Sequence, residues 1–155
     1  LAASAWVKAT ARETWGAVAA TWGRHPTGQF FLGFYRDTGH MSAGLIQRDG
    51  REVWARPSES TTSFPYGQWQ HVAFSTDGTT LRLYLNGVEV GSCRHDGLLQ
   101  KPAPAKLTIG CAIDDVTSTE TDERYFCHWS GRIDELAIFN HTLTADQIMA
   151  LYRGK

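Results

Sequence analysis

The acidic residues are the first place to look for catalysis, and two of them, Asp134 and Glu135, follow each other directly in a strand-like segment. Adjacent residues of a strand point to opposite faces of a sheet. Such a pair cannot act across one glycosidic bond, where the two carboxyl groups lie roughly 5–9.5 Å apart. The sequence also contains no G-x-S-x-G, H-E-x-x-H, C-x-x-C or G-x-G-x-x-G motif. The residues therefore predict a protein that is not an enzyme.

An acidic run offers a second kind of chemistry, because hard cations bind several carboxylate and carbonyl oxygens on a loop. The run holds Asp114, Asp115 and Asp122, together with Glu120 and Glu123. Zinc is not expected, since the six histidines lack the clustered spacing of a tetrahedral site. Calcium bound by Asp114, Asp115 and Asp122 is one interpretation. A solvated loop is the other, and otherwise no cofactor is expected.

Aromatic residues near strand ends could bind sugars, whose C–H faces stack on Trp and Tyr while polar groups fix their orientation. Trp54 is the first candidate, with Arg56 beside it. Trp129 next to His128 is the second, and Tyr66 is a further candidate. Ordinary packing is the alternative for each of these rings. Trp15 and Trp22 lie in similar positions.

The three cysteines leave one thiol over in any pairing. Cys111 and Cys127 flank the acidic run, and a disulfide between them would close that loop and contribute about 3 kcal/mol. Cys93 would then be a free thiol or pair elsewhere. A secreted origin fits such a bridge, and a cytosolic protein with free thiols is the alternative.

Length and charge set the class of protein. The 155 residues fit one domain, and 15 Lys and Arg against 16 Asp and Glu give a net charge of −1. A neutral chain of this kind has no electrostatic footprint for nucleic acid or an anionic membrane. No apolar stretch is long enough to span a bilayer.

Short apolar or alternating runs separated by turn dipeptides predict an all-β sandwich or barrel. Three hairpins are expected, at Asp49-Gly50, Asp77-Gly78 and Asn86-Gly87, because these residues tolerate the positive φ angles of tight turns. The expected strands are Ala3–Lys8, Ala17–Trp22, Phe30–Arg36, Gly44–Arg48, Glu52–Arg56, Trp69–Ser75, Thr80–Leu85, Val88–Ser92, Lys106–Cys111 and Gly131–Phe139.

One helix of about ten residues is expected near the C-terminus. Thr144 and Gln147 have the spacing of a capping box, and Leu143 with Ile148 has that of a hydrophobic staple.

Several of these segments together resemble the laminin G-like jelly roll of the concanavalin A-like lectin/glucanase superfamily. The resemblance rests on five segments in the family's order: Ser4–Lys8, Trp69–Phe74, Leu81–Gly87, Leu107–Gly110 and Gly131–Asn140. It implies an all-β fold, a two-sheet antiparallel jelly-roll sandwich with one short C-terminal helix, as a single domain over residues 1–155. The resemblance also implies that the first strand or strands are missing and that Gly131–Phe139 has an open edge.

The resemblance carries functional expectations too, with two departures. Related glucanases carry E-x-D-x-E on one strand, whereas this chain has only Asp134 and Glu135. Related domains often bind calcium at one rim with an aspartate before the Trp69 strand, where this chain reads Tyr66-Gly67-Gln68.

We therefore expect a non-catalytic module of a larger secreted or cell-surface protein that binds glycan, with calcium assistance an option. The alternatives are a protein–protein adhesion or structural module and, less so, a fragment of a glycoside hydrolase. Expected partners are a glycan or an extracellular protein, with an edge-strand dimer or an upstream domain as further options.

Overall fold

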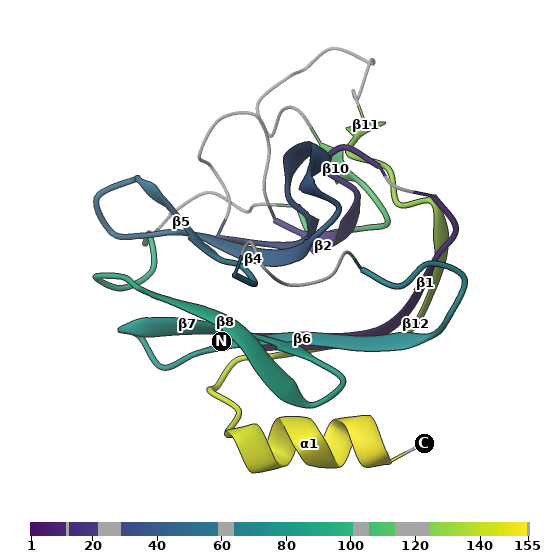
Figure 1. Ribbon diagram of the computed structural model, residues 1–155. Coiled ribbons are helices and arrows are strands. Elements are labelled where there is room, and N and C mark those ends of the chain that lie inside the picture. The colour runs from purple at the N-terminus through teal and green to yellow at the C-terminus, as the bar shows by residue number, and fades with distance from the viewer. Residues whose placement is uncertain (12, 22–28, 59–63, 101–105, 114–124, 155) are drawn as a thin grey trace.

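The computed structural model describes residues 1–11, 13–21, 29–58, 64–100, 106–113 and 125–154. Two five-stranded antiparallel sheets lie face to face, and one helix lies outside the first sheet (Figure 1). This arrangement confirms the predicted jelly-roll sandwich. The elements in chain order are β1 (Ala2–Ala9), β2 (Ala17–Ala20), β3 (Phe30–Phe34), η1 (Arg36–Thr38), β4 (Met41–Ile46), β5 (Glu52–Ala55), β6 (Gln70–Thr76), β7 (Thr80–Leu85), β8 (Val88–Arg94), β9 (Thr108–Ile109), β10 (Ala112–Ile113), β11 (Tyr125–Phe126), β12 (Gly131–Phe139) and α1 (Ala145–Arg153).

The first sheet has the strand order β12-β1-β6-β7-β8. Two of its connections are predicted hairpins, β6–β7 at Asp77-Gly78 and β7–β8 at Asn86-Gly87. Asn86 and Gly87 have φ angles of 51° and 78°, the left-handed values that a type I′ turn needs at both central positions. The alternation of β7 is also confirmed, because Leu81 and Leu83 are buried in the core and Arg82 lies on the outer face.

The second sheet has the order β5-β4-β3-β2-β9, and the third predicted hairpin joins β4 to β5. A separate two-stranded ladder, β10–β11, follows β9 and was not expected from the sequence. The observed β4 begins at Met41, three residues before the predicted start, and β9 covers only Thr108–Ile109 of the predicted Lys106–Cys111. Trp22, the predicted end of β2, lies outside the described residues.

The main core lies between the sheets. Its fully buried side chains include Val7, Leu32, Phe34, Phe74 and Leu83, which come from strands of both sheets. Burial of large apolar side chains of this kind contributes about 1.5–3 kcal/mol each, so this layer supplies most of the stability of the sandwich.

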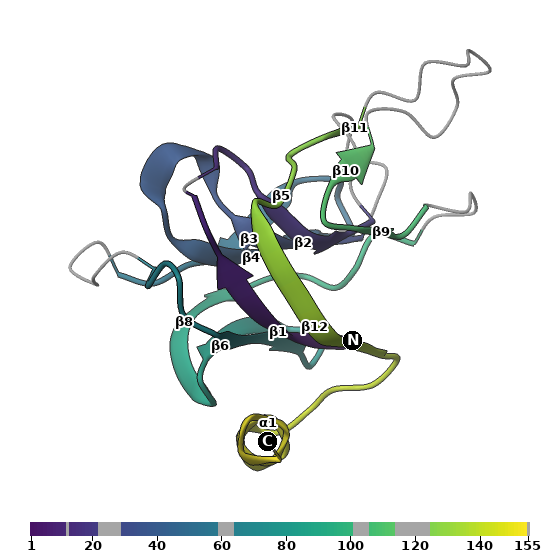
Figure 2. The ribbon, with the colours of Figure 1, turned by 90° about the vertical axis from the view of Figure 1, so that its right-hand side faces the viewer.

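The helix α1 lies on the outer face of the first sheet (Figure 2). Its predicted capping box is confirmed: the Thr144 hydroxyl accepts from the Gln147 N–H, and the Gln147 side chain accepts from the Thr144 N–H. Leu143 and Ile148 are both buried with Ala2, Ala73 and Tyr84 in a second apolar cluster. No helix of the described residues is long and apolar enough to cross a membrane.

Candidate functional site

The outer face of the second sheet carries a group of aromatic rings that we call the aromatic shelf, made of Trp15, Phe31, Tyr35 and Trp54. The floor beneath the rings is built of small residues, which leave room for rings to lie close to the backbone. Gly44 pairs with Trp54 across the β4–β5 hairpin. A Cβ atom at Gly44 would lie only 2.7–2.9 Å from the Trp54 ring, so the indole rests directly on that glycine.

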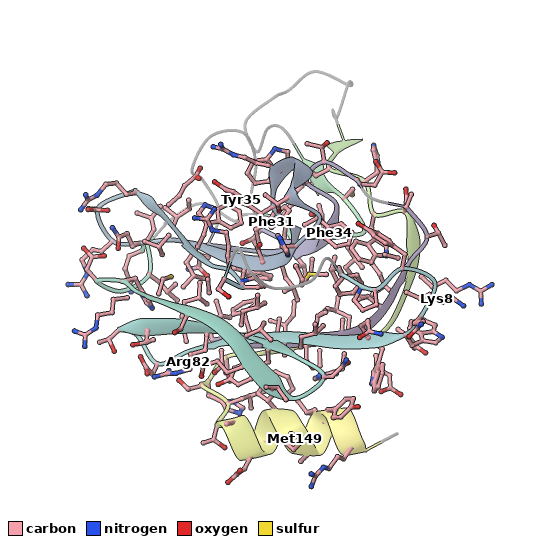
Figure 3. The ribbon with its side chains drawn as sticks, in the orientation of Figure 1. Lys8, Phe31, Phe34, Tyr35, Arg82 and Met149 are labelled. Carbon is pink, nitrogen blue, oxygen red and sulfur yellow. The ribbon has the colours of Figure 1, made fainter. Side chains whose placement is uncertain are left out.

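The four rings contact one another edge to face or tilted, as aromatic quadrupoles prefer. The ring centre of Tyr35 lies 4.7 Å from that of Trp54 and 5.0 Å from that of Trp15. Trp15 and Trp54 are 5.6 Å apart, and Phe31 contacts both from below at 6.1 and 5.8 Å. Figure 3 shows Phe31 and Tyr35 on the side of the second sheet that faces away from the first sheet. Phe31 is buried, whereas Trp15, Tyr35 and Trp54 stay half-buried and open to contact.

Polar groups surround these rings. The Trp54 indole N–H donates to a Glu52 carboxylate oxygen at 3.2 Å, and this hydrogen bond helps to orient the ring. Two exposed arginines lie over the Tyr35 ring: the guanidinium carbon of Arg56 is 4.5 Å and that of Arg36 is 5.2 Å from its centre. Cation–π contacts at exposed sites of this kind contribute about 0.5–1 kcal/mol each.

Several residues at the aromatic shelf have a strained backbone conformation. Five residues other than glycine have positive φ angles in the described part of the chain, and three of them belong to the shelf or contact it. Trp15 has φ 63°, Arg36 has φ 51° and Cys127, which packs against the shelf, has φ 54°. Such conformations cost on the order of 1–3 kcal/mol and persist mainly where the position of a side chain matters.

The main chain of Arg56 is held where the two sheets approach each other. A Cβ atom at Gly91 of β8 would lie 2.1 Å from the Arg56 carbonyl oxygen, so only glycine allows this approach. The same neighbourhood includes Cys93, whose thiol pKa is raised by burial, while the positive charge of Arg56 acts in the opposite direction. Arg56 is therefore anchored by its backbone and exposed at its guanidinium.

The structure distributes the sugar-binding residues expected from the sequence between two places. Trp54 and Arg56 both belong to the shelf region. Trp129 and Tyr66 instead pack against the main core, where Trp129 stacks on Phe34 with ring centres 5.0 Å apart and Tyr66 lies 6.2 Å from the same ring. The main-chain N–H of Trp129 donates to the carbonyl oxygen of Gly110 at 2.8 Å, which places the residue beside the β9–β10 connection. The ring contacts described for Trp129 and Tyr66 are thus made with the core side of β3, and those of Trp54 with the shelf.

His128 is exposed on a segment beside the shelf. Its neighbour Cys127 accepts a hydrogen bond from the Ala17 N–H at 2.8 Å, which brings this segment next to the Trp15–Gly16 turn. No shelf contact of the His128 side chain is observed among the described residues.

The predicted disulfide is not formed. Cys111 is a free thiol, and its sulfur points back toward the carbonyl oxygen of Ile109 at 3.9 Å. Cys127 has a left-handed backbone, and its side chain packs against the small residues and Phe31 of the second sheet. The two side chains therefore point to different surroundings, although their positions flank the β10–β11 ladder.

The predicted calcium ligands Asp114, Asp115 and Asp122 lie outside the described residues. Within the described ranges, no group of three His, Cys, Asp or Glu side chains is arranged to hold a metal ion.

Sequence reasoning missed Tyr35 and Arg36, and it treated Trp15 only as a general candidate. A signal for the shelf was nevertheless present. The Asp49-Gly50 turn sets the register of its hairpin, and that register places Gly44 opposite Trp54. A glycine opposite a tryptophan on an outer face is a place where a ring can lie flat on a strand.

Comparisons with solved structures agree on the fold. A native heptameric SAP-like pentraxin from Limulus polyphemus is 21% identical, with a TM-score of 0.66 over 97% of this chain and 68% of the pentraxin. Domain 4 of AbnA, an extracellular arabinanase from Geobacillus stearothermophilus solved in complex with arabinotriose, is 26% identical, with a TM-score of 0.58 over 98% and 66% of the two chains. The receptor binding domain of botulinum neurotoxin D is 17% identical, with a TM-score of 0.64 over 99% of this chain and 36% of that one.

No protein of curated function matches the chain. The family comparison is decisive, because the laminin G family model described as "Concanavalin A-like lectin/glucanases superfamily" matches residues 1–149. This confirms the resemblance drawn from the five sequence segments. The chain therefore belongs to the laminin G-like domains of the concanavalin A-like lectin/glucanases superfamily.

Proposed function

We propose that this domain is a non-catalytic carbohydrate-binding module of a secreted or cell-surface protein, and that the aromatic shelf binds the sugar. The observation that carries the proposal is the shelf itself: three half-buried rings stand together on a floor of small residues, with arginine and glutamate side chains around them. Apolar ring faces with a few fixed polar groups are the usual composition of a sugar site.

Two further observations support this proposal. Strained backbone at Trp15 and Arg36 is retained at the shelf, as is common at binding sites. A structural relative, domain 4 of the arabinanase AbnA, was solved in complex with arabinotriose. Calcium stays a prediction, to be tested by the same binding experiment.

The experiment is binding of the purified chain to a broad glycan panel, once with calcium and once with EDTA, for the wild type and two tryptophan variants. Trp54→Ala removes a shelf ring. Trp69→Ala is the matched control, because Trp69 is 39% exposed but lies next to β6 of the first sheet. We expect Trp54→Ala to weaken binding at least about tenfold, the effect of losing roughly 1.4 kcal/mol of contact, and Trp69→Ala to bind as wild type.

Two results would overturn the proposal: a folded wild-type protein that binds no glycan in either buffer, or equal binding by wild type and Trp54→Ala. Loss of binding in EDTA would support the predicted calcium, whereas unchanged binding would refute a calcium requirement.

A protein–protein adhesion module is the second candidate, and one surface favours it. A groove of about 560 Å³ lies between α1 and the end of β12, lined in part by Phe139, Leu143 and Leu151. In the described part of the chain, β12 is also an edge strand of the first sheet, and sheet edges can pair with an added strand. Absence of glycan binding would leave this surface as the one to test.

A further inference from the structure

Two positive charges meet at one ring of the shelf. The guanidinium carbons of Arg36 and Arg56 lie within 5.2 Å of the Tyr35 ring centre, and both side chains are exposed. Each cation is held by its contact with the ring, and the two positive charges together attract an anion to the same place.

No acidic side chain of the described residues neutralises these charges. The ion pairs found there are Arg51 with Asp49 and Arg82 with Asp77 and Glu89, and none includes Arg36 or Arg56. Glu52 is the nearest acidic residue along β5, and one of its carboxylate oxygens already accepts the Trp54 indole N–H. Within the described ranges, the positive charge at Tyr35 is therefore not paired with a carboxylate.

The choice of arginine also indicates the kind of ligand. A guanidinium presents several N–H donors in one plane and binds carboxylate or sulfate oxygens in pairs, which a neutral hydroxyl cannot match. Arg36 occupies this position despite a left-handed backbone with φ 51°, and Arg56 is anchored against Gly91. Both groups are thus directed to the edge of the surface on which a sugar ring would stack.

We propose that the shelf selects an anionic saccharide, whose ring stacks on Trp54 and Tyr35 and whose carboxylate or sulfate group binds Arg36 and Arg56. This inference rests on the proposed function and adds the chemical class of the ligand. Uronic acids and sulfated sugars share the chemistry that recognises them, so the test has a separate arm for each.

The test compares charged and neutral saccharides of matched size by calorimetry at low and moderate salt. One arm uses oligogalacturonate and its methyl-esterified form. The other arm uses chondroitin sulfate and its desulfated form. We expect the wild type to prefer the charged member of at least one pair by about tenfold or more, and we expect salt to reduce this preference because exposed charges are screened.

Three variants identify the residues responsible. Arg36→Gln and Arg56→Gln, singly and together, should weaken binding of the charged sugar more than that of the neutral sugar, so that the preference for the charged sugar is lost in the double variant. Arg153→Gln is the control, because this exposed arginine ends α1 on the opposite side of the molecule (Figure 1). Thermal unfolding of each variant verifies that the fold is intact.

The outcomes separate this inference from the proposed function. Equal binding of charged and neutral sugars, or a preference that survives in the double variant, would overturn the anionic ligand while leaving the shelf as a sugar site. A folded wild type that binds neither member of either pair would overturn the inference too. Binding that is insensitive to Trp54→Ala would instead count against the shelf.

Discussion

Both outer faces of the sandwich combine small residues with aromatic side chains, but the two faces differ in what covers them. On the first sheet, small residues such as Ala2 and Ala73 form a floor, and the aromatic residues Trp6 and Tyr84 stand on it. The chain covers this face with its own helix, whose Tyr152 stacks on Trp6 with ring centres 5.7 Å apart. On the second sheet, the aromatic shelf stands on a comparable floor, but no α-helix of the described residues lies over it (Figure 2).

The covered face contributes to the stability of the fold, whereas the uncovered face is the one to which we assign ligand binding in the proposed function. Tyr84 under the helix is 2% exposed, and Ile148 of the helix is fully buried, so that face contributes apolar burial to folding. On the shelf, Trp15, Tyr35 and Trp54 remain half-buried, and strained backbone is retained at Trp15 and Arg36. No acidic side chain of the described residues forms an ion pair with Arg36 or Arg56. A ligand on the second sheet would take the place that α1 occupies on the first.

The largest expected effect on stability comes from the helix-covered face. Ile148→Ala leaves a cavity among Leu143, Ala73 and Tyr84, and truncations of fully buried Ile cost about 2–5 kcal/mol. Denaturant unfolding should show this loss, and thermal unfolding should show a midpoint lower by roughly 4–20 °C for a domain of this size. Glycan affinity should not change.

Leu151→Ala is the matched control for that experiment, because Leu151 lies on the same helix but is 36% exposed. Its loss of stability should be well below that of Ile148→Ala. The comparison between the faces fails if Ile148→Ala unfolds like wild type, or if it weakens glycan binding while the domain stays folded.

A second effect on the same face depends on pH. His71 is buried against Trp6 and Tyr152, and burial lowers its pKa from the ordinary 6.5, while the negative charge of Glu135 acts weakly in the opposite direction. Above pH 6.5 both folded and unfolded chains hold a neutral His71. As the pH falls below 6.5, the unfolded chain takes up a proton first, so stability decreases by up to about 1.4 kcal/mol per pH unit until the folded pKa is reached.

Urea unfolding at pH 7.5 and 5.5, for wild type and His71→Gln, measures this contribution. The wild type should lose more stability between the two pH values than the variant loses. Identical losses in both proteins would show that His71 does not sense pH through its burial under the helix.

The smallest effect on stability is expected at the shelf, where function should change instead. In Gly44→Ala the new Cβ meets the Trp54 indole, a side chain that can shift toward solvent, so the free energy of unfolding should fall by about 1 kcal/mol, the low end of the cost of overpacking. Glycan affinity should nevertheless fall about tenfold, because the ring no longer lies flat on its strand. Chemical unfolding and calorimetry on one sample would measure both.

Gly33→Ala is a second glycine variant on the same face, and its stability can be compared with that of Gly44→Ala. There the new Cβ would lie 2.2 Å from the Gly16 carbonyl oxygen, and a main chain cannot shift as a side chain can. Its stability should therefore fall clearly more than that of Gly44→Ala. Equal stability losses in the two variants would contradict the interpretation of Trp54 as an adjustable ring on a rigid floor.

The fold could be predicted from the sequence because its main determinants are local. Turn residues such as Asn86-Gly87 require positive φ angles at fixed positions, and the Thr144 capping box needs only four residues. The site was less accessible because it depends on which side chains of several paired strands meet on one face, which no single segment of the sequence shows. Trp129 stacks on Phe34 of β3, and its main-chain N–H donates to the Gly110 carbonyl oxygen; nothing near Trp129 in the sequence indicates either contact.

Tyr35 illustrates the same limit. It belongs to the shelf only because β5-β4-β3-β2 is the order of the second sheet, which brings Trp15 and Trp54 to the same ring. Among the residues proposed from sequence, Trp54 and Arg56 reach the shelf because they are two residues apart along β5 and its continuation, which keeps them on one face.

The close approach of Gly91 to Arg56 has a consequence for the kinetics of recognition. The backbone of this arginine is immobilised when the sheets close, and Pro57 after it restricts it further. Much of the conformational entropy that a binding loop ordinarily loses on meeting its ligand is therefore lost earlier, during folding. A pre-organised site of this kind should associate without a slow rearrangement, and a Gly91 variant, which must displace the Arg56 main chain, should lower the association rate as well as the affinity.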